Sequence, residues 1–83
     1  MAKISARGCS ELLRGRKEKP SDMGGKTITI YVLRSDGKLL KSVTWVSPDG
    51  NRNGGNYRIC KTEGTVDVAT VSRRLIEHGF EIK

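Results

Sequence analysis

The sequence contains few of the residues that carry chemistry. Its 83 residues include one histidine, no recognisable catalytic motif and two cysteines, Cys9 and Cys60. Catalytic centres need reactive groups that converge, and two cysteines so far apart in the chain match no metal-ligand spacing. The sequence therefore predicts a binding protein rather than an enzyme, with no metal, no cofactor and two reduced thiols.

Long hydrophobic runs are missing as well. Apolar residues make up 35% of the chain, and no stretch approaches the ~20 apolar residues that cross a bilayer. The N-terminus carries bases but lacks the apolar segment of a signal peptide. We therefore expect a cytoplasmic protein with no membrane partner, and a chain this short has room for one domain with one thin core.

Acidic residues are too few to balance the basic ones. Sixteen Lys and Arg stand against nine Asp and Glu, which gives a formal net charge of +7. A small, strongly basic domain attracts polyanions, of which nucleic acid is the commonest. The alternative is that the charge serves solubility alone.

Composition divides the chain at about residue 25. Residues 1–25 predict a basic, partly disordered arm and linker, in which residues 5–14 could form a short helix that Gly8 and Gly15 weaken. Residues 26–83 predict the folded domain. Its fold class is α+β, with a three-stranded antiparallel sheet, room for a short fourth strand at residues 80–83, and one C-terminal helix packed on one face.

A hairpin gives the strongest local signal. Residues 26–34 and 39–46 are β-prone, and Asp36-Gly37 between them is typical of a two-residue type I′ turn. That turn would pair Ile28 with Trp45. One face, expected to point toward the core, then carries Ile28, Ile30, Val32, Leu39, Val43 and Trp45, with Lys41 as an intruder. The opposite, outward face carries Thr27, Thr29, Tyr31, Leu33, Leu40, Ser42, Thr44 and Val46.

The rest of the domain follows from turn and helix signals. Residues 47–56 are rich in glycine and predict a flexible hairpin loop with Arg52 near its tip, before a third strand at residues 57–61. Gly64 ends that strand, and Thr65 or Asp67 caps the following helix. Val68, Val71 and Leu75, with Ile76 beside them, form the stripe that faces the sheet. His78-Gly79-Phe80 predicts a Schellman stop, with Phe80 folding back toward Leu75.

Two binding functions remain open. In the first, the protein is a nucleic-acid-binding module whose Arg14, Arg16, Lys17, Lys19, Arg52, Arg73 and Arg74 hold phosphates, while Tyr31, Ser42, Thr44 and Arg58 present the outward face to bases. In the second, it is an inhibitor or adaptor protein that acts by binding a host protein. That function would use Tyr31, Leu33, Leu40 and Val46 as apolar anchors, or an exposed edge strand. The protein would be a monomer or an edge-strand homodimer.

Two resemblances bear on this choice. The outline of residues 26–79 resembles the arm-type DNA-binding domains of phage and transposon integrases, which implies that the sheet enters the major groove of duplex DNA. It is less similar to a double-stranded RNA-binding domain, because Asp67-Val68-Ala69-Thr70 stands where that family has a lysine-rich helix start. The segments MAKISARG and YVLRSDG resemble short uncharacterised proteins of actinobacteria and their phages, which implies a phage-encoded accessory protein.

Overall fold

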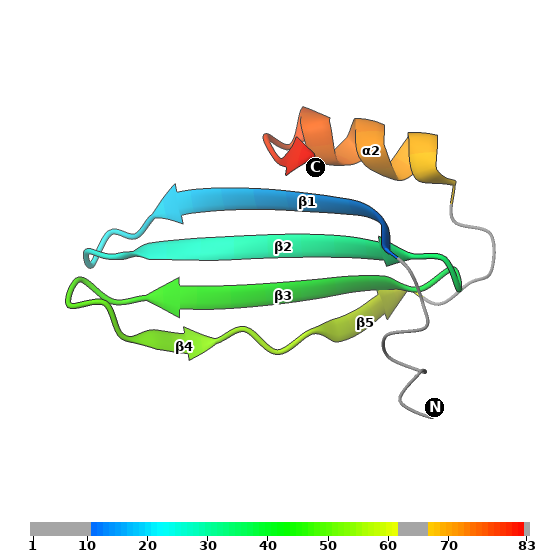
Figure 1. Cartoon of the computed structure of the whole chain (residues 1–83). Helices are drawn as coiled ribbons and strands as arrows, with labels where there is room; N and C mark the ends of the chain where they lie inside the picture. The colour runs from blue at the N-terminus through cyan, green and yellow to red at the C-terminus, as the bar shows by residue number, and fades with distance from the viewer. Residues whose placement is uncertain (1–10, 62–66, 83) are drawn as a thin grey trace, which may run out of the picture.

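The structure, a computed structural model, describes residues 11–61 and 67–82. In these residues one antiparallel sheet of six strands carries one C-terminal helix (Figure 1). The elements are β1 Glu11–Pro20, β2 Lys26–Arg34, β3 Leu39–Val46, β4 Arg52–Gly54, β5 Arg58–Lys61, α2 Val68–Glu77 and β6 Glu81–Ile82. The strand order is β4-β3-β2-β1-β6, and β5 pairs with β3 beside β4. The predicted α+β class is confirmed, as are the antiparallel sheet, the C-terminal helix and the short strand after it, but the expected count of three main strands is wrong.

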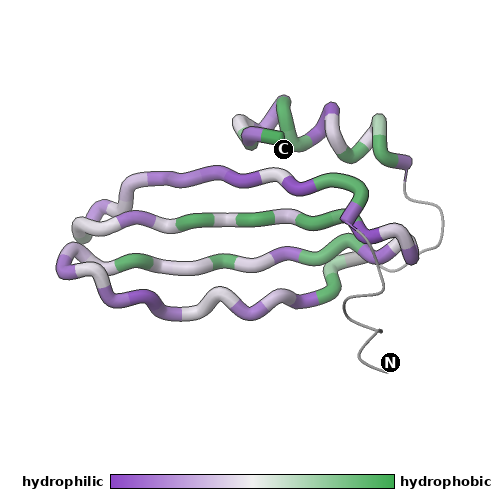
Figure 2. Tube along the Cα trace, viewed as in Figure 1, coloured by the Kyte–Doolittle hydropathy of each residue, from purple (hydrophilic) through white to green (hydrophobic). Residues whose placement is uncertain are grey.

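The largest departure from the predicted fold is β1. The sequence assigned residues 11–20 to a basic arm, yet they form a ten-residue strand that pairs with β2 on one side and β6 on the other. Apart from its start, β1 is hydrophilic along its length, so it shows no apolar alternation (Figure 2). Residues 1–10 of the predicted arm, with most of its short helix and Cys9, lie outside the described residues. The predicted linker at residues 21–25 forms the turn between β1 and β2.

Three turns of one kind connect β1 to β4. In each turn, the backbone O of the first residue accepts from the N–H of a glycine three positions later. The N–H of the same first residue donates to the backbone O of the residue four positions later: Ser21 to Gly25, Arg34 to Lys38, and Ser47 to Asn51. The glycines Gly24, Gly37 and Gly50 have φ values of 86°, 86° and 93°. These are three-residue loops, a type I turn followed by a left-handed glycine, rather than two-residue loops.

This turn type shifts the register of the central hairpin by one residue. A type I′ turn needs positive φ at both central positions, but no described non-glycine residue has positive φ, so Asp36 does not fit that turn. Asp36 instead accepts from the backbone N–H of Lys38 at 3.2 Å. The strands therefore pair Ile28 with Thr44 and Thr27 with Trp45. Because side chains alternate, a shift of one residue moves every β3 side chain to the other face relative to β2.

The two faces therefore differ from the predicted ones. The helix-side face carries Leu13, Gly15, Lys17, Lys19, Thr27, Thr29, Tyr31, Leu33, Leu39, Lys41, Val43 and Trp45. The far face carries Arg14, Arg16, Glu18, Lys26, Ile28, Ile30, Val32, Leu40, Ser42, Thr44 and Val46. The helix covers Leu33, which is 1% exposed, so the expectation that Leu33 points outward is wrong. Ile28 and Val32 of the predicted core face are buried as expected, but on the far face and not beneath the helix.

The glycine-rich stretch after β3 is shorter as a loop than predicted. A tight turn at Ser47–Asn51 leads directly into β4, which places Arg52 in a strand opposite Val46 and not at a loop tip. Gly54, the last residue of β4, and Gly55 after it have φ values of 86° and 98°, and β5 begins at Arg58. The predicted third strand is thus present as β5, and a second short strand precedes it.

Both ends of α2 match the sequence signals. The Asp67 carboxylate accepts from the backbone N–H of Thr70 at 3.2 Å and from its hydroxyl at 2.8 Å, which caps the first turn. At the other end Gly79 (φ 87°) donates to Ile76 O at 3.0 Å and Phe80 to Leu75 O at 2.9 Å. These two bonds define the predicted Schellman stop. The other proposed cap, Thr65, and Gly64 lie outside the described residues.

The buried apolar residues lie on both faces of the sheet: Ile28, Val32 and Leu40 on the far face, and a cluster between α2 and the start of β1 on the helix-side face. Leu13, Leu33 and Leu75 are buried together, and Tyr31, Leu39, Val71, Phe80 and Ile82 pack around them. A Cβ on Gly15 would come within 2.7 Å of Leu75 Cδ1 and 3.3 Å of Ile82 Cδ1, so the missing side chain lets the helix approach the strand. Of the predicted helical stripe, Leu75 and Val71 face this core, whereas Val68 and Ile76 are exposed.

Candidate nucleic-acid interface

A groove of about 760 Å³ runs between α2 and the helix-side face. It exists because α2 contacts β1 and β6, which leaves β2 and β3 partly uncovered on that face. The groove is lined by four cationic side chains, Lys17, Lys19, Lys41 and Arg74, by the hydroxyls of Thr27, Thr29, Tyr31 and Thr70, by apolar and aromatic groups including Leu39, Val71 and Phe80, and by Asp67 and His78. It therefore has a basic rim above a partly apolar floor.

The rings of the floor hold two of the cations in place. Tyr31 and Phe80 pack edge to face, with their centroids 5.4 Å apart. Lys41 Nζ lies 5.5 Å from the centroid of Tyr31, and Lys17 Nζ lies 5.7 Å from that of Phe80. Lys17 also donates to the backbone O of His78 at 2.8 Å, which links β1 to the end of α2. The rings and the carbonyl oxygen carry no net charge, so these contacts do not neutralise the positive charges of the two lysines.

Among the residues that the structure describes, no carboxylate forms an ion pair with the cations of the groove. In residues 11–61 and 67–82, the ion pairs within 4.0 Å do not include Lys17, Lys19, Lys41 or Arg74. Of the described residues that line the groove, the one acid is Asp67, which is engaged as the helix cap. Its hydrogen bonds from Thr70 lower the pKa of this carboxylate, and nearby Arg73 lowers it further. The groove is therefore a site of positive potential.

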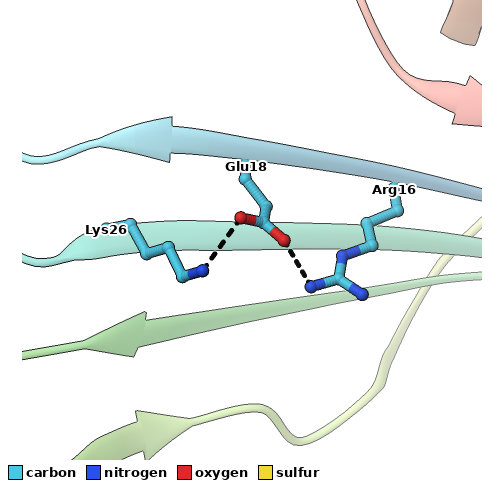
Figure 3. A network of polar contacts seen from close by, with 3 residues as sticks. All are labelled: Arg16, Glu18 and Lys26. Carbon is cyan, nitrogen blue, oxygen red and sulfur yellow. Dashed lines mark hydrogen bonds and ion pairs between the residues drawn. The ribbon is translucent and has the colours of Figure 1, made fainter. Parts of the chain in front are cut away.

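The far face carries the opposite arrangement, in which acids neutralise bases. Glu18 of β1 binds Lys26 at 3.0 Å and Arg16 at 2.5 Å, and the three side chains form one network (Figure 3). The hydrogen bond from Lys26 is the main cause that lowers the pKa of Glu18. Arg14 binds Glu11 at 2.6 Å, and this hydrogen bond raises the pKa of Arg14.

The structure divides the predicted phosphate-binding residues between the two faces. Lys17, Lys19 and Arg74 meet in the groove. The remaining members do not join them: Arg14 and Arg16 are paired on the far face, Arg52 is exposed on the same face, and Arg73 is exposed on α2 outside the groove. The sequence placed all of them around one partner because it treated residues 14–19 as an arm, whereas a strand sends alternate side chains to opposite faces.

The residues predicted to face bases are divided in the same way. Tyr31 lies in the groove, and Arg58, the register partner of Lys41, is exposed on the same side. Ser42 is 4% exposed and donates to Gly55 O at 3.2 Å, so it is not available to a base. Thr44 lies on the far face. Two of the apolar anchors proposed for a protein partner, Leu33 and Leu40, are buried, and the expectation that they are exposed is wrong.

Sequence reasoning missed Lys41, which the predicted register made an intruder in the core. It also missed the threonines that line the groove, Thr27, Thr29 and Thr70. A three-residue reading of the turn at Ser35-Asp36-Gly37 would have placed Lys41 on the same side as Tyr31.

The described residues hold no group of three or more potential metal ligands. Cys60 is exposed, and its thiol donates to Leu39 O at 3.1 Å. No described helix has the length and apolar character needed to cross a membrane.

Comparison with known proteins adds no family. No protein-family model, no curated protein and no solved structure matches the chain. The resemblances drawn from the sequence therefore stay predictions.

Proposed function

We propose that the protein is a small basic nucleic-acid-binding module, DNA being its expected target, and that the groove beside α2 is its binding site. The observation that carries the proposal is the unequal pairing of charge. The cations of the groove have no carboxylate partner in the described part of the chain, whereas those at the β1–β2 edge of the far face are held in ion pairs. Phosphates would supply the missing anions.

The groove offers a different contact to each part of a nucleotide. Lys19, Lys41 and Arg74 provide positive charge for phosphates, and an arginine can also make two parallel hydrogen bonds to one phosphate. The hydroxyls of Thr27 and Thr29 can donate to phosphate or sugar oxygens. Tyr31 and Leu39 provide apolar surface for a base. These contacts do not depend on sequence, so we expect affinity that is governed by charge.

This proposal places the protein in the cytoplasm, where nucleic acid is accessible, and leaves a phage origin open. The competing function, inhibition of a host protein, loses the two proposed anchors that the structure buries. It would be favoured if no nucleic acid bound at low salt.

One pair of variants tests the proposal with matched charge. Arg74→Gln removes an exposed arginine from the groove, and Arg52→Gln removes an exposed arginine from the far face. We expect wild type to bind fluorescently labelled DNA at ~50 mM salt, with an affinity that falls steeply as salt rises. Arg74→Gln should weaken binding and reduce the log-log salt slope by about 0.7 to 0.9, the value for one phosphate contact.

The control decides whether position or net charge matters. Arg52→Gln should leave both the affinity and the slope close to wild type. Equal losses in the two variants would mean that net charge alone attracts DNA, and the groove would not be the site. If neither wild type nor either variant bound DNA or RNA, the nucleic-acid function would be wrong.

A further inference from the structure

We propose that the groove takes single-stranded rather than duplex nucleic acid, and that Trp45 stacks on a base at the open end of the groove. This inference rests on the proposed function and names the class of ligand. It uses a residue that neither the predicted site nor the lining of the groove includes.

The size of the groove favours a single strand. Its volume of about 760 Å³ falls within the range of small-ligand pockets, roughly 300–1,000 Å³, and suits a few nucleotides. A duplex cannot enter a space of this size, because α2 forms one wall and the sheet the other. A sheet that reads the major groove must also present a free face, and α2 occupies part of this one. The bases of a single strand, in contrast, are unpaired and can reach the floor.

The groove leads to Trp45 along one row of the sheet. Lys19 pairs with Thr27 in the register of β1 and β2, and Thr27 pairs with Trp45 in that of β2 and β3. Lys19 and Thr27 line the groove. Adjacent strands lie about 4.8 Å apart, so the indole is the next side chain beyond the groove on the helix-side face.

The helix does not cover this row. Figure 1 shows α2 alongside the half of β1 where that strand begins, while the half where β1 and β3 end, which holds Trp45, extends past the helix. Trp45 is partly exposed, and its neighbour two residues earlier on the same face, Val43, is 44% exposed. Beside Trp45 stand a threonine hydroxyl and Lys19, which forms no ion pair with any carboxylate that the structure describes. A tryptophan in this position is a platform on which a base can stack while its phosphate contacts Lys19.

Charge supports the same ligand. A single strand carries a phosphate at every nucleotide, so its backbone can follow the cations that line the groove, from Arg74 and Lys41 to Lys19. Stacking on an aromatic ring tolerates any base. We therefore expect sequence-tolerant binding of single-stranded DNA or RNA, with the bases turned toward the sheet.

The single tryptophan of the chain makes the test direct. We would titrate the full-length protein with oligothymidylate of about ten nucleotides, and separately with a hairpin duplex of similar charge, while recording tryptophan fluorescence and anisotropy. Oligothymidylate should quench Trp45 and bind more tightly than the duplex. Trp45→Leu should lower the affinity for oligothymidylate by about fivefold or more.

Tyr57→Leu provides the matched control, since Tyr57 is a ring on the other side of the sheet with an exposed fraction of 44%. It should bind like wild type. Quenching of the wild-type protein needs no substitution, so the inference stays testable even if Trp45→Leu is poorly folded.

The outcomes separate this inference from the function beneath it. If anisotropy reports salt-dependent binding but Trp45 is not quenched, or if duplex binds as tightly as the single strand, the single-strand inference is wrong and the nucleic-acid function stands. If neither ligand binds, both are wrong.

Discussion

At the residue scale, Asp67 shows how one side chain fixes an element and ties its stability to pH. Its carboxylate caps α2 through two contacts with Thr70, and these hydrogen bonds lower its pKa from the ordinary value of 3.8. A group whose pKa is lower in the folded state binds fewer protons there than in the unfolded chain. Its contribution to stability is therefore complete above the unfolded pKa and is lost as pH falls through the folded pKa.

Replacement of this carboxylate tests that account. Asp67→Asn keeps a side-chain oxygen that can cap the helix, so at neutral pH its melting temperature should stay close to wild type. Below about pH 3.8 it should lose stability less steeply than wild type, because it lacks the titrating group. Thermal unfolding followed by circular dichroism from neutral pH to about pH 2 measures both.

The control for this substitution removes the cap itself. Asp67→Ala should be less stable than Asp67→Asn at neutral pH while showing the same reduced pH dependence. Glu18 and Asp49 also have lowered pKa values, so both variants should still lose some stability as pH falls. If both variants lost stability at low pH as steeply as wild type, the cap would not depend on the charge of Asp67.

At the element scale, the hairpin turns decide which side chains share a face. The position of the central turn could be predicted from Asp36-Gly37, and the caps of α2 from Asp67 and Gly79. The turn type could not, because an Asp-Gly pair fits both a two-residue loop and the last two positions of a three-residue loop. A difference of one residue placed Leu39, Lys41, Val43 and Trp45 on the same face as Tyr31 and Leu33, which is the face beneath the helix.

Gly37 provides the test of that turn. In a three-residue loop Gly37 is the residue with positive φ, here 86°, so Gly37→Ala should cost roughly 1–2 kcal/mol of folding free energy. Gly37→Asn should cost less, because asparagine tolerates this conformation. Urea unfolding monitored through Trp45 gives both values.

A parallel substitution at Asp36 identifies the turn type. In the observed turn Asp36 has negative φ, so Asp36→Gly should not stabilise the hairpin. In a type I′ turn both central residues have positive φ, and the same substitution would stabilise it. A clear gain in stability from Asp36→Gly would therefore contradict the register described here.

The strand that the sequence did not predict, β1, shows the limit of pattern reading. Periodicity identifies a strand when one face is apolar, but β1 places lysines on the helix-side face and ion-paired residues on the far face. Its pairing depends on β2 and on β6, which is distant in sequence. A strand held by its neighbours and by ion pairs has little local sequence signal. Because β1 contributes Lys17 and Lys19 to the groove, the groove could not be predicted without this strand.

At the scale of the whole molecule, the structure is a thin plate, 38 × 33 × 19 Å, with two broad faces of different character. One has cations paired with acids, and the other has a groove whose cations form no ion pair within residues 11–61 and 67–82. The sequence predicted the excess of positive charge and four residues of the groove, Lys17, Lys19, Tyr31 and Arg74. It could not predict how the remaining charges divide between faces, since that depends on β1 and on the register of β2 and β3.

The claim that the helix-side face is the binding face can be tested most directly by mapping methyl-group chemical shifts during titration with a single-stranded oligonucleotide. The methyl groups of Leu39, Val43 and Val71 lie on or beside the groove, whereas those of Ile30 and Ile59 report the far face. We predict that the first group shifts progressively with added oligonucleotide and that the second stays in place. Shifts confined to Ile30 and Ile59 would contradict the account.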